Sequence, residues 1–139
     1  MGTKPASEIE TQNVIKFFNE TKIDGALDFH SYSQLLLRPW QWTTSSSPDE
    51  SGLMSLGEKM AKAIQANGEP YRNIRGSQLY VHSGAMVDFF YGDKKIFGYT
   101  VELRDRGRYG FALPPSLILP TCVENYFGSL EFIEHFIKN

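Results

Sequence analysis

Apolar residues recur along this chain with two spacings, and the spacings predict where its helices and strands lie. Positions three and four apart are apolar in three stretches, which predicts helices over 8–21, 51–66 and 120–137. A short apolar segment over 26–30 predicts a buried strand, and β-branched and aromatic residues over 96–103 predict a second one. Because helices alternate with strands and no repeat is present, the sequence predicts one α/β domain.

Shorter features complete this outline. Residues 34–37 predict another extended segment, which Pro39 halts, and 84–90 predict a short helix. Ser7 and Glu10 have the spacing of a capping box, in which the serine caps the helix backbone and the glutamate reaches back to it. The last predicted helix is amphipathic and gathers apolar side chains on one face: Val123, Phe127, Leu130, Ile133 and Phe136.

Composition and charge narrow the classes of partner. Lys and Arg total 14 against 16 Asp and Glu, and the net charge of -2 gives no electrostatic case for nucleic acid or an anionic membrane surface. No apolar run approaches the ~20 residues that span a bilayer, and the first residues lack the apolar core of a signal peptide. Cys122 is the only cysteine, which excludes an internal disulfide and a cysteine-rich zinc site in this sequence.

Two residues stand out for their chemistry. His30 ends an apolar strand segment, where ligands gather in open α/β sheets, so it is either a hydrogen-bonded structural histidine or a metal ligand. Glu102 lies in a segment that otherwise reads as buried, and a buried charge requires a partner. It is either paired with Arg104, Arg106 or Arg108, or a general base whose pKa is raised by its surroundings.

Four segments, in matching order and spacing, resemble the pancreatic carboxypeptidase A/B family of zinc metallocarboxypeptidases. They are Ser7-Glu8-Ile9-Glu10, His30-Ser31-Tyr32-Ser33-Gln34-Leu35-Leu36-Leu37, Leu79-Tyr80 with Ser83-Gly84 and Asp88, and Glu102-Leu103-Arg104-Asp105 with Gly107-Arg108-Tyr109-Gly110-Phe111. The similarity covers nearly the whole chain, and the second and fourth segments are specific. It implies that 1–139 form the C-terminal half of a mixed-sheet, phosphorylase/hydrolase-like peptidase domain whose N-terminal half is absent.

The resemblance also implies roles for the matched positions. His30 matches the third protein ligand of the catalytic zinc, and Glu102 matches the carboxylate that activates the attacking water. Tyr80 matches the mobile tyrosine that closes over the substrate and hydrogen-bonds its terminal carboxylate. Other matched positions line the substrate cleft and its specificity pocket, with an aliphatic residue at the pocket floor: Ser31, Tyr32, Thr100, Phe111 and, at the floor, Val87.

Three further expectations come from the resemblance. Peptide bonds after Ser31, Pro39 and Arg104 are expected to be cis. The implied activity is zinc-dependent release of one C-terminal residue from peptides or proteins, outside the cell or in a vacuole. The aliphatic floor at Val87 favours hydrophobic C-terminal residues, whereas Arg75, which aligns near the same pocket, would favour acidic ones if its side chain pointed inward.

The chain departs from the family pattern at the metal site. A catalytic zinc needs three protein ligands, and family members supply the other two from an upstream HxxE motif. No HxxE occurs in this sequence, so we expect the chain alone to be inactive. A non-catalytic remnant, or a binding or regulatory fragment, is the alternative. We also expect an exposed apolar face where the missing half of the domain would pack.

Overall fold

The computed structural model describes residues 2–138, which form a four-stranded mixed sheet with helices on both sides. The strand order is β1 (Gly25–Ser31), β4 (Phe97–Leu103), β2 (Leu35–Arg38) and β3 (Arg72–Arg75). The β1–β4 and β2–β3 pairs are parallel, and β2 runs antiparallel to β4. This mixed sheet confirms the predicted α/β class. The sequence did not reveal β3, because its four residues show no run of apolar positions.

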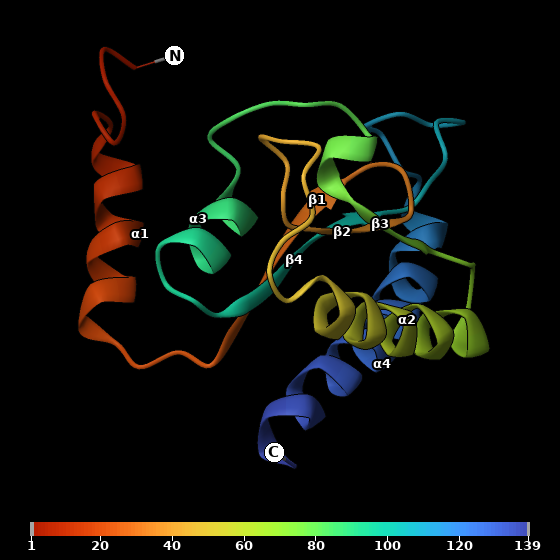
Figure 1. Ribbon diagram of the computed structural model, residues 1–139. Helices are drawn as coiled ribbons and strands as arrows, with labels where there is room; N and C mark the ends of the chain where they lie inside the picture. The colour runs from red at the N-terminus through yellow and green to blue at the C-terminus, as the bar shows by residue number, and fades with distance from the viewer. Residues whose placement is uncertain (1, 139) are drawn as a thin grey trace.

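Four α-helices occur within the described residues: α1 (Ile9–Glu20), α2 (Glu50–Asn67), α3 (Met86–Gly92) and α4 (Ile118–Ile137). Their ends lie within two residues of the predicted ones. Short 3-10 turns occupy Gly76–Gln78 and Pro115–Leu117. Figure 1 shows α2 and α4 together on one side of the sheet, and α3 between the sheet and α1 on the other. None of the helices within 2–138 is both long and apolar enough to cross a membrane.

The start of α1 differs from the predicted capping box. Glu8, not Ser7, is the N-cap residue, and no side chain caps the helix. The Ser7 hydroxyl instead donates to the Glu8 carboxylate, with 2.7 Å between Oγ and Oε1. The capping-box prediction was therefore wrong. Since α1 also buries none of its residues, its position depends on ring contacts such as that between Phe18 and Phe90.

The predicted burial of β1 was also wrong. Its residues are half-buried or exposed, and Phe29 is 51% exposed. The physical reason lies in the strand order, because β1 is at the edge of the sheet and pairs with β4 alone among the described strands. By contrast β2 lies inside the sheet, and the apolar side chains of Leu35–Leu37 are fully buried.

Helix α4 packs against α2 through an unexpectedly polar face. A Cβ at Gly128 would lie 2.7 Å from Cγ1 of Ile64, so glycine is what allows the two helices to approach this closely. The other buried residues of the face are Phe132 and three polar residues, Thr121, Glu124 and Asn125.

The opposite face of α4 is apolar and exposed. Leu119, Tyr126 and Ile133 follow at intervals of seven and Ile137 comes four later, so all four lie on one stripe of the helix. Each of them is at least half exposed. We call these four residues the exposed stripe. The described chain thus exposes an apolar surface, and that the rest of the domain packs on it stays a prediction.

The exposed stripe leads to a prediction about solution behaviour. We expect the purified 139-residue chain to self-associate, because burying apolar surface gains about 25 cal/mol per Å². Size-exclusion chromatography with light scattering should show mass increasing with concentration. Replacing Leu119 and Ile133 with serine should shift the population towards monomer, whereas the same change at exposed Ile9 should not. A monomer at every concentration tested would contradict this expectation.

Candidate functional site

The register of β1 and β4 brings four chemically active side chains to one face of the sheet. His30 pairs with Glu102 in the parallel ladder, and Asp28 pairs with Thr100. Because side chains two residues apart on a strand share a face, all four point the same way. They line a cavity of about 310 Å³.

The segment before α3 forms another wall of this cavity. Tyr80 lies there with its ring centroid 4.5 Å from that of His82, and it remains 61% exposed. His82 also places its Nδ1 3.2 Å from the backbone oxygen of Tyr80. His30, Tyr80 and Glu102 therefore border one cavity although they are far apart in sequence, as the resemblance implied.

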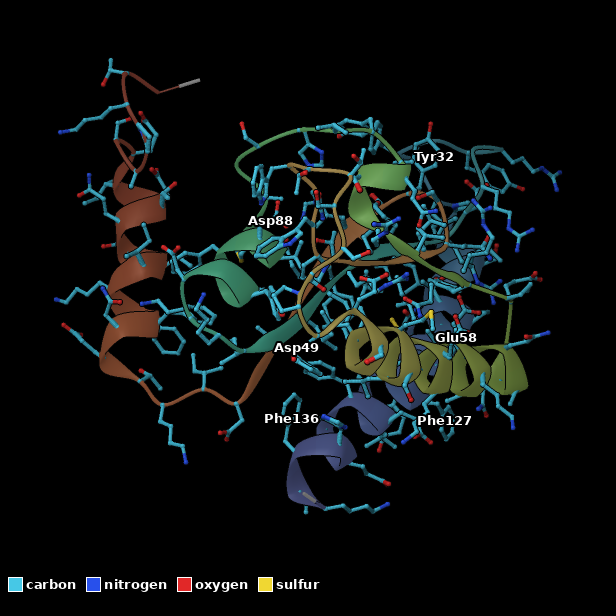
Figure 2. The ribbon with its side chains drawn as sticks, in the orientation of Figure 1. Tyr32, Asp49, Glu58, Asp88, Phe127 and Phe136 are labelled. Atoms are coloured by element: carbon cyan, nitrogen blue, oxygen red, sulfur yellow. The ribbon has the colours of Figure 1, made fainter. Side chains whose placement is uncertain are left out.

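Gln41 and Thr100 contribute a polar part of the lining. The Gln41 side-chain amide donates to the Thr100 hydroxyl over 3.2 Å. The backbone of Gln41 is held in turn by Asp88 at the start of α3, whose carboxylate accepts N–H groups from Gln41 and Trp42 at 2.9–3.1 Å (Figure 2). Burial raises the pKa of Asp88, and these two N–H groups oppose that rise.

Cis peptide bonds flank the elements that carry the site. They join Ser31 to Tyr32, Pro39 to Trp40 and Arg104 to Asp105, and all three confirm what the resemblance implied. The first directly follows β1, and the second leads into Gln41.

Glu102 is a half-buried carboxyl whose pKa its surroundings alter. Burial raises the pKa of its carboxyl, the carboxylate of Asp28 raises it further, and His30 lowers it. The three nearby arginines are engaged elsewhere. Arg104 pairs with Glu124, Arg106 donates to the Pro70 carbonyl, and Arg108 lies over the Tyr109 ring. The interpretation of Glu102 as the partner of one of these arginines is therefore wrong.

His30 forms a hydrogen bond through one of its two ring nitrogens. Its Nε2 lies 2.8 Å from Oδ2 of Asp28, and an ionised carboxylate can only accept a hydrogen bond. The other ring nitrogen, Nδ1, then keeps its lone pair, as a zinc ligand must. No group of three or more His, Cys, Asp and Glu side chains suited to a metal occurs within 2–138. Within these residues, His30 therefore has a free ring nitrogen of the type that binds zinc.

Several predicted site residues lie outside the cavity lining. Val87 is fully buried, and the neighbouring Met86 lines the cavity instead. Ser31 is exposed at the end of β1. Tyr32 and Phe111 contact each other edge to face with ring centroids 5.0 Å apart, and Figure 2 shows Tyr32 beside the loop after β4. The described residues therefore group His30, Tyr80, Thr100 and Glu102, but not these four, around one cavity.

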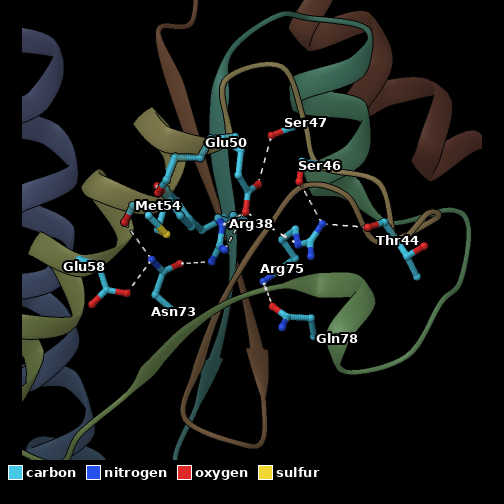
Figure 3. A network of polar contacts seen from close by, with 12 residues as sticks. Arg38, Thr44, Ser46, Ser47, Glu50, Met54, Glu58, Asn73, Arg75 and Gln78 are labelled. Atoms are coloured by element: carbon cyan, nitrogen blue, oxygen red, sulfur yellow. Dashed lines mark hydrogen bonds and ion pairs between the residues drawn. The ribbon is translucent and has the colours of Figure 1, made fainter.

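Arg75 is directed into a different polar network. Its guanidinium donates to the Thr44 carbonyl over 2.8 Å and to the Ser46 hydroxyl over 3.2 Å (Figure 3). Glu50, which forms an ion pair with Arg38, lies 3.8 Å away. Arg75 is not among the residues that line the cavity, so the geometry gives no support to a preference for acidic C-terminal residues.

Sequence reasoning missed two functional candidates that line the cavity, Asp28 and His82. The period-two pattern of a strand could have found Asp28, because it stands two positions before His30 and so shares its face.

Comparisons with known proteins agree with this geometry. The family model "Zinc carboxypeptidase" matches residues 1–128. Bovine carboxypeptidase A1 is 38% identical over 138 residues, covering 96% of this chain and 32% of that protein. Human carboxypeptidase O is 40% identical, covering 96% of this chain and 37% of its own. The chain therefore spans about a third of the length of these relatives.

Solved structures give the same result for the fold. The crystal structure of thrombin-activatable fibrinolysis inhibitor superimposes with a TM-score of 0.93 at 35% identity, covering 99% of this chain and 36% of that one. The bovine form of that protein, in complex with tick carboxypeptidase inhibitor, gives a TM-score of 0.92 at 35% identity, covering 99% of this chain and 48% of that one. The chain belongs to the zinc carboxypeptidase family, whose members are peptide hydrolases.

Proposed function

We propose that this chain contributes the general base, one zinc ligand and part of the substrate cleft to a metallocarboxypeptidase that releases single C-terminal residues. The observation that carries the proposal is the convergence of His30, Tyr80 and Glu102 on one cavity. Three separate segments supply these residues, and each has the residue type that its proposed role needs. The rest of the domain, including two zinc ligands, is the partner that the chain requires.

Glu102 and Tyr80 have separate parts in the proposed hydrolysis. Bound zinc would supply Lewis-acid polarisation of the scissile carbonyl. Glu102 takes a proton from the attacking water and passes it to the leaving amine, a task favoured by a raised pKa. Tyr80 is exposed at the cavity wall, so its hydroxyl is free to swing towards the terminal carboxylate of a peptide.

The cavity lining supports a preference for hydrophobic C-terminal residues. Its apolar side chains are Leu37, Leu79, Ala85 and Met86. A lysine or arginine side chain would need an acidic partner, and one carboxylate in the lining, Asp28, already accepts from His30. The other, Glu102, is committed to proton transfer. Peptide and protein C-termini outside the cell or in a vacuole are the substrates we propose.

A chimaera tests this function. The 139 residues would replace the matching region of bovine carboxypeptidase A1, which restores the absent part of the domain. We expect zinc-dependent release of C-terminal Leu and Phe by the chimaera, slower release of Lys and Glu, and no release by the 139-residue chain alone. Hydrolysis by the isolated chain would contradict the proposal that two of the zinc ligands come from the rest of the domain.

A non-catalytic role is the second candidate. Such a chain would keep the cleft but bind no zinc. A chimaera that melts cooperatively and still releases no C-terminal residue would support this role over catalysis.

A further inference from the structure

The side chains of Asp28 and His30 form a pair at the edge of the cavity. Oδ2 of Asp28 and Nε2 of His30 are 2.8 Å apart, and both residues come from the same face of β1. The Asp28 side chain is 19% exposed and the His30 side chain 50% exposed. The carboxylate is thus the anchored member of the pair, and the imidazole is the member that reaches into the open part of the cavity.

We propose that Asp28 is a positioning residue that fixes the tautomer and orientation of the His30 ring. The carboxylate accepts a hydrogen bond from Nε2–H, which leaves Nδ1 as the nitrogen with a free lone pair. This inference rests on the proposed role of His30 as a zinc ligand. Histidines that bind metals typically donate their other ring N–H to a carboxylate or carbonyl, which orients the ring and increases its basicity.

The geometry favours this role for Asp28 over two others. A purely structural carboxylate at this point would accept hydrogen bonds from backbone N–H groups, as Asp88 does, but the Asp28 carboxylate accepts from His30. A specificity residue for cationic substrates would need its oxygens directed at the substrate, yet Oδ2 is already engaged.

The tautomer can be read directly with no metal present. Magic-angle-spinning ¹⁵N NMR of the histidine-labelled 139-residue chain shows which ring nitrogen carries the proton. The method also works on a self-associated sample, and a pH of about 8 keeps ordinary imidazoles neutral. We expect His30 to show one tautomer, with the proton on Nε2. In Asp28→Asn and Asp28→Ala we expect a mixture of both tautomers. Asp24→Asn is the matched control, because Asp24 lies just before β1 and its recorded ion pair is with Lys22.

Zinc affinity provides the second measurement, made on the chimaera by competition with a chelator. Asp28→Asn should weaken zinc binding by about 10- to 100-fold, the range seen when a partner of a metal ligand is removed. The ratio of Leu to Lys release should stay unchanged. Circular dichroism melting establishes that each variant is folded.

Two results would overturn the inference. One is an unchanged His30 tautomer and unchanged zinc affinity in Asp28→Asn. The other is unchanged zinc affinity with a shifted Leu-to-Lys ratio, which would make Asp28 a specificity residue. An inactive chimaera would instead count against the proposed function, since the tautomer measurement needs neither zinc nor turnover.

Discussion

Replacing Glu124 with alanine is expected to lower the free energy of unfolding by about 3–5 kcal/mol, because it removes one member of a buried ion pair. Glu124 is completely buried on α4. Arg104 donates to both of its oxygens, and Tyr71 and the Glu69 backbone N–H add hydrogen bonds of 3.0 and 2.9 Å. Removing the carboxylate leaves the guanidinium and two further donors without their acceptor.

The pKa values of the partners show how strongly this network is coupled. The hydrogen bond to Glu124 raises the pKa of Arg104, and burial, together with the charge of Glu124, raises the pKa of Tyr71. Glutamine at position 124 keeps the shape but brings an amide N–H towards these donors. We therefore expect Glu124→Gln to be destabilising as well, by less than the alanine variant.

Urea unfolding of the chimaera, followed by tryptophan fluorescence, measures this effect. Glu20→Ala is the control, because Glu20 pairs with Lys16 at the surface over 3.9 Å and its loss should leave the unfolding midpoint nearly unchanged. The double variant Arg104→Met with Glu124→Leu should be less destabilised than the sum of the two single changes. A Glu124→Ala variant that unfolds at the same urea concentration as the unaltered protein would refute the argument.

The same network explains why the burial of α4 was hard to predict. Periodicity identified the apolar face with Val123, Phe127 and Ile133, and an amphipathic helix ordinarily buries such a face. Here the face that packs on α2 carries Glu124 and Asn125, because Arg104 and Tyr71 supply their partners. Pairing between distant residues leaves no trace in the local spacing of apolar positions, so the pattern gave the helix but not its orientation.

Element type was predictable where local spacing decides it. The helices and the strands around 26–30, 34–37 and 96–103 formed close to their predicted ends. Strand β3 was not predictable, since pairing with β2 rather than its own composition makes it a strand. The exposure of β1 was not predictable for a related reason, because its place at the sheet edge depends on pairing with β4 and not on its own residues.

The candidate site was likewise only partly predictable from the sequence. Spacing alone left His30 and Glu102 ambiguous, because their neighbourhood arises from the parallel pairing of β1 with β4 across most of the chain. Only the resemblance to a known family connected them with Tyr80. Where that resemblance was specific, at the three cis peptide bonds and the shared cavity, the structure agrees.

Replacing Glu102 with glutamine is expected to reduce kcat of the chimaera by about 10²- to 10⁴-fold, the usual contribution of a positioned general base. Glutamine keeps the side-chain shape but cannot take a proton, so the loss should fall on kcat while KM changes little. Initial rates on a peptide ending in Leu, measured over a range of concentrations at saturating zinc, separate the two constants. Glu10→Gln, on the exposed surface of α1, is the matched control and should leave both unchanged. Should Glu102→Gln raise KM and spare kcat, Glu102 would be a residue that binds the substrate rather than the base.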